Sequence, residues 1–186
     1  MVNIKDRLIL GAVAGLGGNL AKLAIERIAM KMNLAELSGP ERAAGMLVAG
    51  HKTATTEGKI VGCITDSIIS VVLGTATVYA LSVAGKDKAV IKGALIGKVA
   101  WTGLYGMLAT MGATKVGPVG PKTVLSELVA HTTYGATTAY IATKFGDPSL
   151  FSGQVPLSKS PQNNVNQAAP AHESGKDDNK NNACGL

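Results

Sequence analysis

Aromatic residues, cysteines and charged residues are all scarce in this chain. Its 186 residues include one Trp, four Tyr, two Phe and two Cys, and only 16% of them are charged. Cys63 and Cys184 lie too far apart in the sequence to form a metal-binding spacing, and two cysteines make no disulfide framework. The sequence also has no P-loop, nucleophile elbow, HExxH motif or CxxC pair. We therefore expect neither an enzyme nor a bound metal or cofactor.

Apolar and small residues are abundant instead. Hydrophobic residues make up 46% of the chain, and 23 residues are glycine. Nearly all of this material lies in residues 1–150, because the last 36 residues are polar. Many small residues among apolar ones are typical of helices that pack closely in lipid.

Four apolar segments are long enough to cross a bilayer as helices. At about 1.5 Å per residue, some 24 residues span a hydrocarbon core of about 30 Å with some tilt. Turn signals rich in Gly and Pro separate the segments, which are too long to be strands. The sequence therefore predicts an all-α integral membrane four-helix bundle. Its helices are expected at about residues 8–32, 60–84, 89–112 and 122–145.

Two other stretches complete the organisation. Residues 33–59 connect the first two helices, and Pro40 to Gly50 could form a short interfacial helix capped by Ser38 or Gly39. Residues 1–150 would then form the transmembrane domain. Residues 151–186 are too polar to bury a core, so we expect a disordered tail.

A weak internal repeat relates the second and fourth segments. A displacement of 61 residues superposes Asp66 on Glu127 and Ser70 on His131. Two similar helical hairpins would produce such a pattern. Gly, Ala and Thr are common in these helices, so a chance resemblance is the alternative.

Ionisable residues within the apolar segments are the best candidates for a functional site. A charge at the centre of a bilayer costs about 3 kcal/mol or more unless it is paired or hydrated, so these side chains should face the interior. If the chain crosses four times, Glu26, Asp66 and Glu127 lie at one depth, about 9 Å inside the same surface. The candidates for an ion-binding, proton-binding or polar interior site are Asn19, Lys22, Glu26, Asp66, Lys98, Glu127 and His131.

Two readings of these charges remain open. In the first, Glu26, Asp66 and Glu127 bind a proton or cation, while His131 and Lys98 tune that site, so the protein is proton- or cation-coupled or responds to pH. In the second, pairs such as Lys22 with Glu26, or Lys98 with Asp66 or Glu127, only hold helices together in a scaffold or accessory subunit. Binding of a small solute is a third use of the same polar interior.

Glycines at helical spacing indicate close helix packing. A GxxxG-type face lets two backbones approach each other. The glycines concerned are Gly11, Gly15, Gly18, Gly93 and Gly97.

The positive charge of the chain does not point to nucleic acid. The net charge is +6, but the cations are spread over the ends of the apolar segments. Lipid is thus the expected partner, with self-association or a membrane complex in addition. Cations near one surface are Lys5, Arg7, Lys86, Lys88, Lys92 and Lys144, and near the other Lys31, Arg42, Lys52, Lys59, Lys115 and Lys122. The dense connection from Lys86 to Lys92 favours the cytoplasm for its side, and so for both termini.

Three short motifs resemble a known group of proteins. They are Lys5-Asp-Arg-Leu followed by Gly-Ala-Val-Ala-Gly, then Gly39-Pro-Glu-Arg42, then Ala109-Thr-Met-Gly-Ala-Thr114. Together they are similar to small bacterial inner-membrane proteins of the YagU-like type, over about residues 5–150. The resemblance implies residence in the bacterial cytoplasmic membrane and a part in acid tolerance. It carries over no catalytic position.

Overall fold

The described part of the chain is helical, as the sequence predicts. The structure is a computed structural model that describes residues 3–107, 110–112 and 119–152, without the side chain of Tyr105. Within these ranges no strand occurs, although a single isolated bridge joins Ile4 to Gly146. The expected disorder of the tail falls almost entirely on residues 153–186, outside the described residues.

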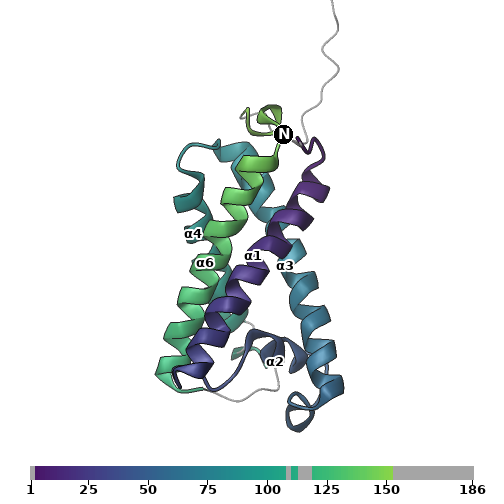
Figure 1. Ribbon diagram of the computed structural model, residues 1–186, viewed down its shortest axis with the longest axis vertical. Helices are drawn as coiled ribbons and strands as arrows, with labels where there is room; N and C mark the ends of the chain where they lie inside the picture. The colour runs from purple at the N-terminus through teal and green to yellow at the C-terminus, as the bar shows by residue number, and fades with distance from the viewer. Residues whose placement is uncertain (1–2, 108–109, 113–118, 153–186) are drawn as a thin grey trace, which may run out of the picture.

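Long helices lie side by side along the molecule, and short ones join them (Figure 1). Helix α1 descends from the end that carries the N-terminus, α3 returns, α4 descends again and α6 returns (Figure 1). The long elements are α1 (Arg7–Lys31), α3 (Thr56–Ala84), α4 (Ala89–Trp101) and α6 (Pro121–Phe145). The short ones are α2 (Gly39–Ala44), η1 (Gly50–Lys52), η2 (Thr102–Met107) and η3 (Pro148–Phe151). Among the described helices, α1 and α3 are each long and apolar enough to cross a membrane.

Local sequence explains where the helices begin. The Asp6 carboxylate accepts the backbone N–H groups of Leu8 and Ile9 at the start of α1, and Thr55 caps α3 in the same way. Ser38 and Glu41 form a capping box at α2. A short helix therefore follows Ser38, but it ends at Ala44 rather than Gly50.

The third apolar segment differs from the expected continuous helix over 89–112. Regular α-helix ends at Trp101, and residues Thr102–Met107 form a π-helix. Gly103 and Gly106 lie in this stretch, and glycine disfavours regular helix by about 1 kcal/mol each. The third helix thus changes its winding partway along the molecule.

The side chain of a lysine stabilises the connection between α3 and α4. The Lys92 ammonium donates to the carbonyls of Ala84 and Gly85 and to the Asp87 carboxylate, the last at 2.9 Å. This hydrogen bond, together with the positive charge of Lys92, lowers the pKa of exposed Asp87 below its usual 3.8. The side chain of Lys92 therefore ends α3 and orients the start of α4.

Glycines bring the helices into close contact at two equivalent crossings. A side-chain carbon on Gly11 or Gly15 of α1 would strike the α3 backbone at Thr75 or Ser70. The same atom on Gly93 or Gly97 of α4 would strike the α6 backbone at Gly135 or His131. Ser70 and Gly74 of α3 correspond to His131 and Gly135 of α6 by the 61-residue displacement, so the repeat is visible in the packing of each hairpin.

The two hairpins are joined mainly through α1 and α6. Gly18 of α1 lies against Thr138 and Tyr134 of α6, and Gly17 lies against Ile141. A small apolar core fills the end near the N-terminus. It includes Leu10, Ala14, Val78, Leu81, Ala139, Ala142, Leu150 and Phe151. The interior at the other end is polar.

Candidate functional site

Three buried carboxylates from three helices lie close together at the polar end of the interior. Glu26 belongs to α1, Asp66 to α3 and Glu127 to α6. Each of these residues is at most 6% exposed to solvent. We call the group formed by Lys22, Glu26, Arg42, Asp66, Glu127 and His131 the charge cluster. It combines the three acids with two cations and one imidazole.

Lys22 joins the first two acids. Its ammonium nitrogen lies 2.5 Å from Oδ1 of Asp66 and 3.7 Å from Oε1 of Glu26, one helical turn further along α1. The stronger contact is therefore the one to Asp66. The packing of Gly15 on Ser70 sets this register, because one turn beyond it on each helix brings α1 to Asn19 and α3 to Asp66.

Arg42 neutralises the third acid. Its Nε and Nη2 both donate to Oε1 of Glu127, at 3.1 and 2.6 Å. Arg42 belongs to α2, so the short helix inserts its guanidinium between the long ones. The sequence placed Arg42 among the cations near one membrane surface and did not identify it as a partner of Glu127, beside which it is buried.

Glu26 receives weaker compensation than the other two acids. Its Oε2 accepts the backbone N–H of Gly39 at 3.0 Å, while its Oε1 has no hydrogen-bond partner among the described residues. Asp66 Oδ2 and the side-chain oxygen of Asn19 also lack a described partner. A buried acceptor without a donor costs about 1–3 kcal/mol, so these oxygens favour the arrival of a proton or a donor.

His131 stands one turn above Glu127 on α6 and faces the same interior. Its Nδ1 lies 2.9 Å from the backbone carbonyl of Glu127. A carbonyl only accepts, so Nδ1 carries a proton and Nε2 is the acceptor of the neutral ring. Tyr134, one turn further, donates its hydroxyl to the carbonyl of Ser70 at 2.7 Å and so ties α6 to α3.

The structure places most of the expected site residues in the interior, with one difference. Asn19, Lys22, Glu26, Asp66, Glu127 and His131 are all buried. Lys98 is instead exposed on α4, and no ion pair joins it to Asp66 or Glu127 in the described ranges. Lys22 pairs with Asp66 and Arg42 pairs with Glu127, the two acids for which Lys98 was the expected partner. Lys98 does not reach them, because α4 packs against α6 through Gly93 and Gly97. Lys98, one residue beyond Gly97, turns outward.

The net charge of the cluster indicates that it can take up a proton. Two cations face three carboxylates, so with neutral His131 and all five other groups ionised the cluster carries a net charge of −1. The ion pairs are also electrostatically coupled, since Glu127 experiences the charges of Glu26 and Lys22. One added proton would make the cluster neutral. No group of three or more His, Cys, Asp or Glu residues in the described part of the chain has metal-binding geometry.

Comparison of the chain with family models, curated proteins and solved structures gave no match.

Proposed function

We propose that the chain is a four-helix integral membrane protein whose charge cluster binds a proton, so that the protein is proton-coupled or responds to pH. The distribution of residues supports the membrane part, because ionisable groups are buried while large apolar side chains are exposed. In water, the apolar side chains would be buried and the ionisable groups exposed. Lipid favours the observed arrangement. Exposed apolar residues on the long helices include Leu16, Leu20, Ile64, Ile68, Val72, Leu95, Val99, Leu125 and Val129.

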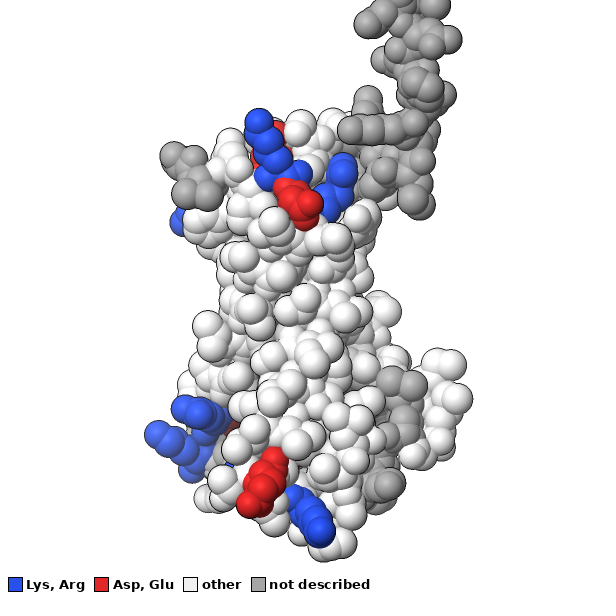
Figure 2. Space-filling view, turned by 90° about the vertical axis from the view of Figure 1, so that its right-hand side faces the viewer, with Lys and Arg blue, Asp and Glu red and all other residues white. Residues whose placement is uncertain are grey.

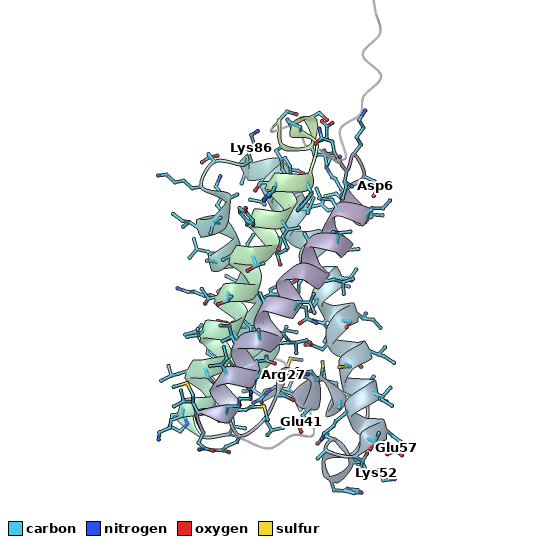
Figure 3. The ribbon with its side chains drawn as sticks, viewed as in Figure 1. Asp6, Arg27, Glu41, Lys52, Glu57 and Lys86 are labelled. Carbon is cyan, nitrogen blue, oxygen red and sulfur yellow. The ribbon has the colours of Figure 1, made fainter. Side chains whose placement is uncertain are left out.

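The outer charges also fit a membrane. Figure 2 shows Lys, Arg, Asp and Glu side chains at the two ends, with an uncharged waist between them on the visible face. Asp6 and Lys86 lie at one end, whereas Arg27, Glu41, Lys52 and Glu57 lie at the other (Figure 3). Exposed Lys98 lies between the ends along α4, where its long aliphatic stem would let the ammonium reach toward an interface.

The proposed location is the cytoplasmic membrane, crossed several times. The N-terminal residues and η3 lie at the same end as the α3–α4 connection (Figure 1). The cations of that connection, Lys86, Lys88 and Lys92, favour the cytoplasmic side for it. The charge cluster would then lie nearer the outer face.

The surplus negative charge of the cluster carries the functional proposal. Asp66 and Glu127 each have a close cation, whereas Glu26 lies 3.7 Å from an ammonium that is already bound to Asp66. Glu26 is therefore the acid whose neutralisation removes the excess charge at least cost, since a buried unpaired charge is expensive. A pH response also agrees with the acid tolerance that the YagU-like resemblance implies.

Proton binding can be tested without knowing the physiological role. We expect acidification of the reconstituted protein to produce an infrared band of a protonated, dehydrated carboxylic acid, and Glu26→Gln to abolish that band. The matched control is Glu57→Gln, which removes an exposed acid at the start of α3 and should leave the band unchanged. A band that persists in Glu26→Gln, or is missing from the unmodified protein, would reject the proposal.

A non-catalytic scaffold is the second candidate, and one observation favours it. Every acid of the cluster contacts a donor from another element: Asp66 contacts Lys22 of α1, Glu26 contacts Gly39 of α2, and Glu127 contacts Arg42 of α2. Charges that only tie helices together would make Glu26→Gln change stability or self-association without any proton signal. The infrared measurement combined with the oligomeric state therefore separates the two candidates.

A further inference from the structure

Helix α2 is held inside the molecule by contacts with three long helices. Its first residue donates to Glu26 of α1, and its arginine donates to Glu127 of α6. On its third side, α2 packs on α3, where Gly62 lies against the Pro40 carbonyl and the Ala44 side chain. Figure 1 shows α2 at the end of the molecule opposite the N-terminus, beside the lower part of α3. Two of the three contacts that hold α2 in place are thus made with buried carboxylates.

The start of α2 lies directly on the charge cluster. A side-chain carbon built on Gly39 would fall 2.6 Å from Oε1 of Glu26 and 2.9 Å from the ammonium nitrogen of Lys22. A side chain at this position would therefore force the ends of the Glu26 and Lys22 side chains to shift. Gly39 is itself buried, so the short helix separates Glu26 from the surroundings of the molecule.

The strength of the contact between α2 and Glu26 depends on the charge of that acid. A hydrogen bond to an ionised carboxylate is roughly twice as strong as one between neutral groups. The charged groups that act on Glu26 are Lys22 on its own helix, Asp66 on α3 and Glu127 on α6. Arg42 of α2 and His131 of α6 belong to the same cluster. When Glu26 takes up a proton, its bond to the Gly39 N–H weakens, while the bond between Arg42 and Glu127 keeps its charges.

We propose that α2 is a lid over the proton site, closed while Glu26 is ionised and loosened when Glu26 is protonated, with the Arg42–Glu127 ion pair keeping the helix attached. Opening exposes the cluster to water at the end of the molecule where α2 lies. Closure excludes water again once the proton has left. This inference rests on the proposed function. It adds a helix that moves and the end of the molecule from which water reaches the cluster.

A spin label next to α2 tests the lid. Leu47 follows α2 and is 65% exposed, so a nitroxide on Leu47→Cys should be tolerated, with Cys63→Ser and Cys184→Ser removing the native thiols. Acidification should raise the ratio of mobile to immobile label by about tenfold, the difference between a charged and a neutral hydrogen bond. In Glu26→Gln the label should already be mobile at neutral pH and should not respond further. A label at exposed Val13 of α1 should stay unchanged throughout.

Gly39→Ala provides a second variant that leaves every titrating group in place. Its methyl group crowds Glu26 and Lys22, so the Leu47 label should be mobile at neutral pH while the infrared carboxylic acid band remains. The control is Gly103→Ala, because a side-chain carbon there meets nothing within 4 Å.

The outcomes separate the lid from proton binding. A carboxylic acid band with a label that ignores pH would overturn the lid and leave the proton site standing. Absence of the band in the unmodified protein would overturn the proposed function. A label that still responds to pH in Glu26→Gln would overturn the lid, because another group would then control α2.

Discussion

Replacing Lys22 with methionine is expected to lower the free energy of unfolding by about 3–5 kcal/mol, the typical cost of breaking a buried ion pair by removing one partner. Lys22 compensates Asp66 at 2.5 Å and also approaches Glu26, so its loss leaves two acids without a cation. Methionine keeps the length and the apolar stem of the side chain. Unfolding of the protein in mixed micelles, followed by circular dichroism, measures the effect.

The same variant has a pH signature. Acidification protonates the uncompensated carboxylates, so the loss of stability in Lys22→Met should shrink as the pH falls. Lys98→Met is the control, since Lys98 is exposed and should change the free energy of unfolding by little. Equal effects of the two substitutions would show that the described pairing is wrong.

Replacing Gly74 with leucine is the second change with a large expected effect, a loss of about 3 kcal/mol in the free energy of unfolding. A side-chain carbon on Gly74 would strike the carbonyl of Gly11 and the backbone of Gly15, so α1 and α3 would have to separate. Their separation also pulls Lys22 away from Asp66. Thermal unfolding in detergent should show the loss, whereas Gly103→Leu, in open space, should not.

The internal repeat adds a quantitative condition to this experiment. Gly135 is the counterpart of Gly74 and lies in the same way against Gly93 and Gly97 of α4. Gly135→Leu should therefore destabilise the protein by a similar amount. A large effect at one glycine and none at the other would mean that the two crossings are not equivalent.

Much of the fold follows from the distribution of apolar residues. The first helix was expected at about residues 8–32 and is observed at Arg7–Lys31; the last was expected at about 122–145 and is observed at Pro121–Phe145. Long apolar runs and the Gly and Pro turns between them determine these limits. The start of α3 at Thr56 was missed, because its first turn is polar and carries Glu57.

The partners in the charge cluster were harder to predict. The cost of burying a charge shows that Asp66 and Glu127 must face inward, but it does not say which cation meets them. Arg42 lies in a short polar segment with the composition of a surface turn, and only its position in three dimensions shows it beside Glu127. Lys98 lies within an apolar segment, where an ionisable residue is expected to face the interior. The packing of Gly97 on α6 nevertheless turns it outward. The sequence offered one signal for a further buried cation such as Arg42: the predicted interior contained more acids than cations.

The most direct test is the environment of α3 in liposomes. Nitroxide labels at exposed positions 64, 68 and 72, in protein without its native cysteines, report contact with lipid or water through collisions with dissolved oxygen or with a water-soluble nickel chelate. Lipid around these positions predicts strong relaxation by oxygen and protection from nickel. Strong relaxation by nickel at all three would place this apolar face in water, and the proposal of a polar interior within a membrane would be wrong.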